Sequence, residues 1–246
     1  MKRLFLILLF LASLPSNSFS SPIISGISAN EINIDSGFNG TKILLFGAKS
    51  NSGHILVAVR GPKKHFLVTK KQKLFGVWYN GKLVEFQDSY GFYSDFSTTN
   101  NRDFISSLAK ELEIGTENLR FKPSDKNNEK EEDEFRNELI KRMKTENLYT
   151  PNITGVDFLD DTLFKVTLNF PKNIIRGIYT VEIYLIDNGS LSSFQSIPIY
   201  VNQAGLSGKI FDFAYQQSFL YGLLAVAIAL IFGWFVNYIF VRFFGK

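Results

Sequence analysis

The sequence predicts a mainly β protein: an immunoglobulin-like β-sandwich with an inserted helical hairpin, followed by one transmembrane helix. Three observations support this fold class. Short segments with period-2 alternation lie on both sides of a helical stretch at about residues 102–148, and a long uncharged apolar segment lies near the C-terminus. With 246 residues, 45% of them hydrophobic, the chain can build a packed core, and its lack of cysteine excludes a disulfide scaffold.

The net charge of +4 comes from the two ends of the chain. Lys2 and Arg3 open the sequence and Arg242 and Lys246 close it, while the first 20 and the last 29 residues contain no Asp or Glu. The region between these cations is neutral, with 23 basic and 23 acidic residues. This distribution is typical of membrane targeting, and we therefore expect no nucleic-acid partner.

Residues 1–20 have the pattern of a secretory signal peptide. Lys2 and Arg3 form the basic region, residues 4–14 the apolar region, and Ser18 and Ser20 the small residues before a cleavage site. An uncleaved anchor or a buried strand is the alternative. No cysteine follows the apolar region, so a lipid-anchored lipoprotein is excluded.

The N-terminal flank contains a series of predicted strands without helices between them, a spacing typical of a sandwich. They are residues 31–35, 42–46, 55–60, 65–69, 75–79 and 83–86. Gly61-Pro62 and Asn80-Gly81 are the predicted turns, and Asn-Gly favours the type I′ turn of a hairpin.

Two helices are predicted in the middle of the chain. Apolar residues recur at helical spacing over 102–113, with Gly115 just beyond as a C-cap. Residues 127–147 have acidic first turns, basic last turns and a narrow apolar stripe, which suits the helix dipole. The charges of this second helix are interpreted as a solvated face, with an acidic docking surface or cation site as the alternative.

The C-terminal flank is predicted as a meander of three or four antiparallel strands. Residues 164–170 alternate between apolar and polar side chains, and so do residues 179–185. Asp187-Asn188-Gly189 then forms a turn toward a strand that ends at residues 197–201. Two architectures fit this order: one sandwich of residues 21–203 shared by early and late strands, which we favour, or two separate β modules.

Residues 219–241 are predicted to cross a membrane. These 23 residues span about 34 Å as a helix, against a hydrocarbon core of about 30 Å. Arg242 and Lys246 follow as topology anchors, which places the tail of residues 242–246 in the cytoplasm and the ectodomain on the opposite side. Residues 204–218 form the juxtamembrane segment.

Ala225, Ala229, Gly233 and Asn237 recur every four residues within this helix. Small residues allow close helix–helix approach, and an Asn can hydrogen-bond across the contact. The bilayer is thus one partner, and the predicted second is another membrane protein or a second copy of the chain. The alternative is that Ala and Gly are simply common in membrane helices.

Chemical motifs are few. His54 and His65 flank a predicted hairpin, and two histidines are too few for a multi-histidine zinc site. Asp160 and Asp161 are adjacent carboxylates in a predicted turn. The four residues Ile34-Asp35-Ser36-Gly37 resemble the active-site loop of retroviral-type aspartic proteases, which would require a homodimer here; turn formation is the simpler interpretation. We expect no cofactor and no metal site.

Aromatic residues suggest walls for a ligand pocket, although core packing explains them more simply. They are Trp78, Tyr79, Tyr90, Phe92 and Tyr93.

The sequence resembles the alphaproteobacterial family of "putative transmembrane proteins". The matching stretches are residues 38–41 (FNGT), 44–48 (LLFGA), 59–62 (VRGP), 76–78 (GVW), 158–164 (FLDDTLF), 177–182 (GIYTVE) and 221–229 (YGLLAVAIA). The resemblance implies a signal peptide, a periplasmic β-rich region and one C-terminal helix in a Gram-negative inner membrane. It also implies a neighbouring sulfite-exporter-like permease, and it carries over no catalytic residue.

We therefore expect a non-enzymatic, membrane-anchored periplasmic protein that serves as an accessory or interaction module for another inner-membrane protein, such as a transporter. A periplasmic ligand-binding or sensing ectodomain is the first alternative. A membrane-tethered hydrolase is the second.

Overall fold

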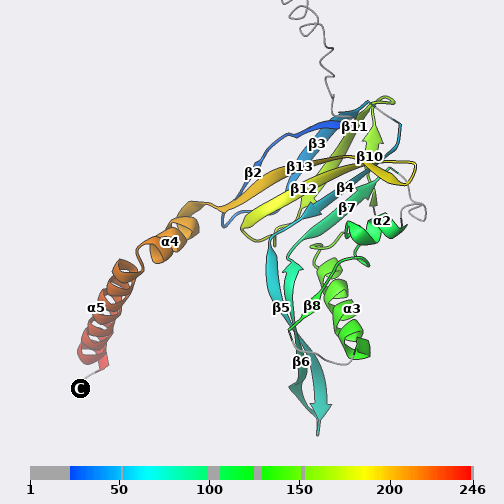
Figure 1. Cartoon of the computed structure of the whole chain (residues 1–246). Helices are drawn as coiled ribbons and strands as arrows, with labels where there is room; N and C mark the ends of the chain where they lie inside the picture. Colours follow the sequence, from blue (N-terminus) through cyan, green and yellow to red (C-terminus); the bar gives the residue numbers. More distant parts are fainter. Residues whose placement is uncertain (1–22, 51, 99–105, 125–128, 151–152, 245–246) are drawn as a thin grey trace, which may run out of the picture.

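The computed structural model describes residues 23–50, 52–98, 106–124, 129–150 and 153–244 (Figure 1). The predicted signal peptide of residues 1–20 and the anchor Lys246 lie outside these residues. The described chain is mainly β, with three sheets and one long apolar C-terminal helix, as predicted. The immunoglobulin-like strand order itself stays a prediction.

Sheets A and B form the two layers of the β region. Sheet A has the order β1 (Ile23–Ile27), β3 (Thr41–Lys49), β11 (Leu163–Phe170) and β10 (Val156–Phe158). Sheet B has the order β2 (Glu31–Ile34), β13 (Ser190–Gln203), β12 (Gly177–Asp187), β4 (His54–Arg60), β7 (Tyr93–Ser97) and β9 (Ile153–Thr154). Each sheet therefore contains early and late strands, as a single shared sandwich requires.

The alternation read from the sequence places one face of each strand in the core. In β11 the even-numbered residues from Phe164 to Phe170 are buried, and in β12 Tyr179, Val181 and Ile183 are fully buried. The Phe170 ring of sheet A and the Tyr179 ring of sheet B meet edge to face at 5.8 Å between centroids. The apolar faces of the two sheets thus enclose one core.

The predicted meander of late strands is confirmed for the antiparallel pair β12 and β13 but is wrong for β11. Strand β11 pairs with β3 and β10 in sheet A, whereas β12 pairs with β13 and β4 in sheet B. The chain changes sheets over residues 171–176. There the Tyr179 hydroxyl donates to the carbonyl of Ile175 (2.9 Å) and accepts from its amide (3.2 Å), an arrangement similar to the tyrosine corner of sandwich folds. Period-2 alternation marks a buried face but does not specify the neighbouring strand.

The insertion between β7 and β9 packs against the β4 and β7 side of sheet B, where Arg60 and Tyr93 hydrogen-bond to residues 112–115. It contains α2 (Ser106–Glu111), β8 (Lys122–Pro123) and α3 (Glu129–Thr145), so the predicted hairpin of two helices also contains a strand. Phe104 and Ile105, which we assigned to the first helix, lie outside the described residues. Because the core covers one face of β4 and the insertion the other, every residue of 55–60 is buried.

Strands β5 (Lys63–Leu74) and β6 (Val77–Tyr90) form a long hairpin that projects from the sandwich, with β8 paired to β6 near its base (Figure 1). Its turn lies at Phe75 and Gly76, whose φ angles are +50° and +86°. The predicted turn at Asn80-Gly81 is wrong: both residues lie inside β6, where the register shifts opposite Thr69 and Lys71. An Asn-Gly pair can also accommodate a β-bulge, and that happens here.

The predicted turn at Gly61-Pro62 is also wrong, because these residues lie between β4 and β5 and hydrogen-bond to Phe92 and Gly91. The predicted turn at residues 187–189 is confirmed. Asn188 and Gly189 have φ angles of +50° and +76°, and they join β12 to β13 with Asp187 opposite Ser190.

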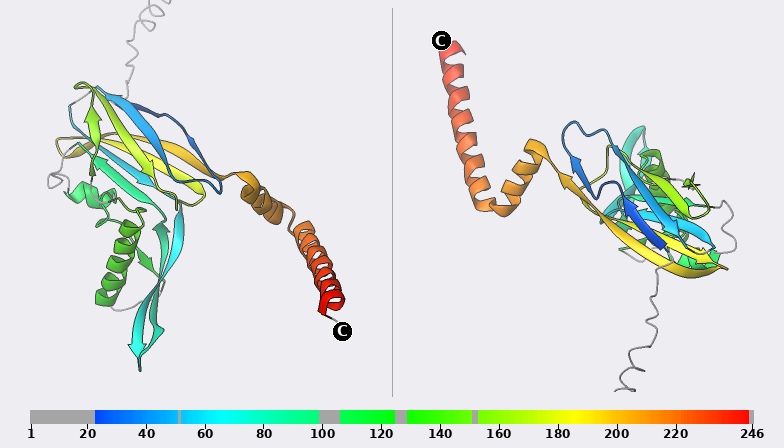
Figure 2. Two further views of the ribbon diagram at one scale, coloured as in Figure 1. Left: turned by 180° about the vertical axis from the view of Figure 1, so that it is seen from behind. Right: turned by 90° about the horizontal axis from the view of Figure 1, so that it is seen from above.

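After β13 the chain forms α4 (Gly205–Gln216) and then α5 (Ser218–Phe244), which extend away from the sheets (Figure 2). Among the described residues α5 provides one candidate membrane span, Ser218–Arg242, which is unburied by the rest of the chain. Its 25 residues give about 37 Å of helix, enough to cross a bilayer. The predicted span of residues 219–241 matches it.

The register identifies the end of the sandwich that faces α5. In sheet B, Gly177 pairs with Val201 and Thr180 with Arg60, so the end of β13 and the end of β4 lie together. The hairpin β5–β6 and the helices α4–α5 therefore leave the same end, which we call the anchor end (Figure 1). At the opposite, far end lie the 187–190 turn and the first residue of β1, Ile23.

Candidate functional site

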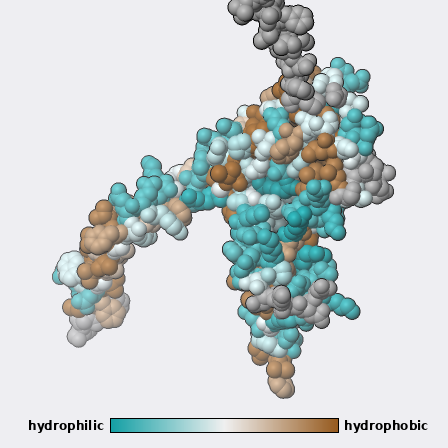
Figure 3. All heavy atoms as spheres, viewed as in Figure 1, coloured by the Kyte–Doolittle hydropathy of each residue, from teal (hydrophilic) through white to brown (hydrophobic). Residues whose placement is uncertain are grey.

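Two exposed apolar features project from the sandwich, helix α5 and the tip of the β5–β6 hairpin, while a further exposed apolar patch that includes Ile24, Phe46 and Leu163 lies on sheet A. Both projections extend from the anchor end, and Figure 3 shows both as brown regions separated from the sandwich by hydrophilic surface. We consider them first, and then the hollows and ionisable groups of the sandwich.

The four predicted packing residues lie on helix α5. At 100° per residue, Ala225, Ala229 and Gly233 fall within an arc of about 80°, and Asn237 continues it. Gly222 shares this arc, although we did not include it among the predicted packing residues. A Cβ added at Gly222 or Gly233 would meet nothing within 4 Å, so this face is open. Arg242, the described topology anchor, is exposed in the last turn.

The apolar hairpin tip is defined by five exposed side chains. They are Leu74, Phe75, Val77, Trp78 and Tyr79. Phe75 is 97% exposed and Trp78 is 65% exposed. A cluster of large apolar side chains on a projecting hairpin contributes nothing to the core, and such clusters mark interaction surfaces.

Four lysines surround this tip, and the hairpin contains no acidic residue between Phe66 and Val84. Lys70 forms an ion pair with Glu134 of α3 at 2.7 Å, which raises the pKa of that lysine, and Lys82 forms an ion pair with Glu131. Among the described residues no carboxylate lies within 4 Å of the ammonium group of Lys71 or Lys73.

The acidic turns of α3 form a solvated face, as the first interpretation predicts, since the side chains of Glu131 and Glu134 are 45% and 56% exposed. The same two carboxylates pair with Lys82 and Lys70 in the middle of the hairpin. The buried stripe of Phe135, Leu139 and Met143 holds the same helix in place.

The five aromatic residues predicted as pocket walls are not brought together. Trp78 and Tyr79 are exposed at the hairpin tip, whereas Phe92 and Tyr93 are fully buried in the core. Tyr90 lies between them at the hairpin base, where the Lys63 ammonium is 5.1 Å from its ring centroid. Core packing therefore accounts for Phe92 and Tyr93, as the simpler interpretation held.

Buried tyrosines form hydrogen bonds that hold the insertion against sheet B. The Tyr149 hydroxyl donates to the carbonyl of Tyr90 (2.7 Å), and the amide of Gly115 donates to the Tyr93 hydroxyl (2.7 Å). Burial raises the pKa of Tyr149 well above its ordinary value, and it raises the pKa of Tyr179 to about 12. These hydroxyls remain neutral and serve structure.

A buried ion pair supports the same contact. Arg60 pairs with Glu182, and its guanidinium also donates to the Tyr184 hydroxyl (3.3 Å). Its Nη2 donates to the carbonyls of Leu112 (2.5 Å) and Glu113 (3.2 Å) in the insertion. Arg60 thus joins the end of β4 to the segment that follows α2.

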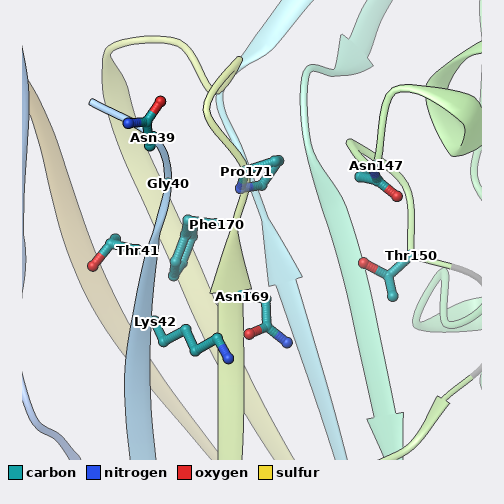
Figure 4. A pocket seen from close by; sticks show the side chains of 9 residues that line it. All are labelled: Asn39, Gly40, Thr41, Lys42, Asn147, Thr150, Asn169, Phe170 and Pro171. Carbon is teal, nitrogen blue, oxygen red and sulfur yellow. The ribbon is translucent and has the colours of Figure 1, made fainter. Parts of the chain in front are cut away.

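A polar hollow of about 500 Å³ lies between the anchor end of sheet A and the end of α3 (Figure 4). Its walls include Asn39, Lys42, Asn147, Thr150 and Asn169. In Figure 4 Asn39, Thr41, Lys42 and Asn169 come from the side of β3 and β11, while Asn147 and Thr150 lie across the hollow. Amides, hydroxyls and one ammonium provide hydrogen bonds but no acid–base pair.

The ionisable residues singled out in the sequence lie apart. Asp35 follows β2 at the anchor end, where its Oδ1 accepts from the Gly37 amide (2.9 Å). Asp160 lies at the far end, and its Oδ1 accepts from the amide of Asp161 (2.7 Å). Both carboxylates thus serve turns.

His54 and His65 lie in different strands, β4 and β5. The Nδ1 of His54 is 3.3 Å from the Thr98 hydroxyl, and the Nδ1 of His65 is 3.3 Å from Glu85. Within the described ranges no group of three or more His, Asp or Glu side chains is placed to hold a metal ion.

Comparison with known proteins supports the membrane assignment. No curated protein matched the sequence. A family model described as "Putative transmembrane protein (Alph_Pro_TM)" matches residues 22–242, which is nearly the whole chain and includes the sandwich, the insertion and α5. The chain therefore belongs to this alphaproteobacterial transmembrane protein family.

Proposed function

We propose that the protein is a non-enzymatic accessory or interaction module for another membrane protein, such as a transporter, in the bacterial inner membrane. In this proposal α5 is the single membrane span. The sandwich lies in the periplasm and the C-terminus in the cytoplasm.

One observation carries this proposal: α5 presents an open face of small residues that the rest of the chain leaves uncovered. In a bilayer a face made of Gly222, Ala225, Ala229 and Gly233 allows a second helix to approach closely. Asn237 on the same face gains a hydrogen bond when another helix covers it.

The distribution of charge supports the orientation. Arg242 follows the span directly, and no acidic residue occurs after Asp212. Basic residues just beyond a span favour the cytoplasmic side. The signal-peptide pattern of residues 1–20 favours export of the sandwich, so both ends of the sequence support the same topology.

The test is purification of the tagged full-length chain from its native membrane in a mild detergent. The decisive variant carries Ala225→Ile, Ala229→Ile and Gly233→Ile. The matched control is Ala227→Ile, which adds the same side chain on the opposite face of α5. We expect a defined membrane protein to co-purify with the wild type and the control but not with the triple variant. Equal recovery from all three would contradict the proposal.

A second candidate function is binding of a small polar molecule in the hollow at the anchor end. Its volume of about 500 Å³ suits a small ligand, and its amides and hydroxyls suit a neutral or anionic one. Thermal unfolding of the full-length protein with a panel of sugars and carboxylic acids would test it. A ligand-induced increase in melting temperature that Asn169→Leu abolishes would support this candidate; no increase with any compound would argue against it.

A further inference from the structure

The apolar hairpin tip is a surface that the proposed function does not use. We propose that it inserts into the headgroup region of the membrane that α5 crosses, and that its lysines favour anionic phospholipids. The hairpin then provides a second membrane contact, which fixes the orientation of the sandwich above the bilayer.

Topology directs the hairpin toward the membrane. The end of β4, from which the hairpin starts, and the end of β13, from which α4 starts, lie together at the anchor end. Strand β5 has 12 residues and rises about 40 Å, whereas the 12 residues of α4 rise about 18 Å. The tip can therefore reach at least as far from the sandwich as the first turn of α5.

The side chains of the tip are those that suit a lipid–water interface. Trp and Tyr are enriched at this depth because one end of the ring is apolar and the other is polar. Trp78 and Tyr79 lie beside Leu74, Phe75 and Val77, and all five are exposed. A hairpin that remained in water would leave this apolar cluster solvated.

The charges favour anionic headgroups. Lys71 and Lys73 flank the tip and have no carboxylate within 4 Å among the described residues, and the Lys73 ammonium is 5.8 Å from the Trp78 ring centroid. Glu131 and Glu134 are already paired with Lys82 and Lys70 nearer the sandwich. The positive charge closest to the tip is therefore free to pair with phosphate.

Trp78 itself provides the assay, because the chain contains only two tryptophans. Trp234→Phe leaves Trp78 as the single tryptophan in the full-length protein. This variant is placed in nanodiscs of phosphatidylcholine, with or without phosphatidylglycerol. Tryptophan emission is measured with lipids brominated near the headgroup and with iodide in the aqueous phase.

A matched control reports from the far end of the sandwich. The Trp78→Phe, Trp234→Phe, Ile24→Trp variant places its only tryptophan on β1, at a position where Ile24 is 68% exposed, close to the 65% of Trp78. We expect brominated lipids to quench Trp78 and not the control tryptophan. We expect iodide to quench the control tryptophan and not Trp78.

Two results would overturn the proposal. Equal quenching of both probes by iodide, with none by brominated lipid, would show that the tip remains in water. Protection of Trp78 from iodide without quenching by brominated lipid would show that a protein surface covers the tip.

The double variant Lys71→Gln, Lys73→Gln tests how much the charge of these lysines contributes to insertion of the tip. Each lysine near an anionic membrane surface contributes about 1 kcal/mol to the free energy of binding, which corresponds to roughly a fivefold change in the binding equilibrium constant. We expect the ratio of inserted to exposed tips to fall about 25-fold in phosphatidylglycerol nanodiscs and to change little in phosphatidylcholine. An unchanged ratio in both lipids would refute the preference for anionic phospholipids.

Discussion

The buried ion pair between Arg60 and Glu182 gives the sharpest prediction about stability. Replacing Glu182 with Leu leaves the Arg60 guanidinium in a nearly dry site, because the Arg60 side chain is only 8% exposed. Tyr184 and the carbonyls of Leu112 and Glu113 remain as hydrogen-bond partners, but none of them carries a negative charge. The variant therefore keeps a buried charge without its counterion.

The size of the expected loss in stability follows from the burial of Arg60 and Glu182. Breaking a fully buried pair by removing one partner destabilises a protein by about 3–5 kcal/mol. The Glu182 side chain is 19% exposed, so water partly solvates the site, and we expect the lower end of that range, about 3 kcal/mol. For a domain of this size the melting temperature should fall by about 6–12 °C.

The assay is urea unfolding of the full-length protein in detergent, followed by the near-ultraviolet circular dichroism of its buried tyrosines. The double variant Arg60→Met, Glu182→Leu removes both charges, and its free energy of unfolding should exceed that of Glu182→Leu, although the carbonyls of Leu112 and Glu113 lose their donor. If both variants lose the same stability, the unpaired Arg60 charge is not the cause of the loss and the argument is refuted.

Three further predictions concern other parts of the fold. Tyr179→Phe should lower the free energy of unfolding by about 1 kcal/mol, because the hydroxyl both donates to and accepts from the backbone of Ile175. Burial raises the pKa of Tyr179 from 10.0 to about 12, so its stabilising contribution is complete below pH 10 and is lost as the pH rises toward 12; urea titrations across this range should show a shallower loss for Tyr179→Phe than for the wild type. Lys70→Met should leave the free energy of unfolding nearly unchanged, and more nearly so in high salt, because its pair with Glu134 is exposed; a clear loss in urea titrations would show that the pair holds α3 on the hairpin. Gly189→Val should lower the melting temperature more than Gly189→Asn, since Gly189 has a φ of +76°, a region that Asn tolerates and a β-branched residue disfavours; equal losses in thermal unfolding would contradict the turn assignment.

Local sequence patterns predicted most of the elements, because the burial of one strand face and the start of a helix depend on neighbouring residues. The alternation of β11, the Asn188-Gly189 turn and the α5 span all followed from such patterns. Strand partners did not follow, because the alternation of β11 is compatible with either sheet. The turn predicted at Asn80-Gly81 was wrong for a related reason, because the same dipeptide fits both a β-bulge and a turn.

The candidate surfaces were predicted less well than the fold. The small-residue face of α5 could be predicted from its four-residue spacing. The hairpin tip could not: residues 75–79 were predicted as a strand, and Trp78 and Tyr79 were predicted as walls of a pocket. Trp78 and Phe92 are both aromatic residues in β-rich sequence, yet one is exposed and the other fully buried. Only the packing of distant strands distinguishes them. The cluster of lysines around residues 70–82 was the sequence feature that could have indicated an exposed hairpin.

The most direct test of the proposed interaction maps the α5 face inside the native membrane. The chain contains no cysteine, so single cysteines can be placed at each position from 222 to 233 and joined to neighbouring proteins with a short photo-activated thiol cross-linker. The proposal predicts that the yield follows the helical period, with maxima at Gly222, Ala225, Ala229 and Gly233 and minima at Ala227 and Ile231. Uniform yields around the helix, or maxima at Ala227 and Ile231, would contradict it.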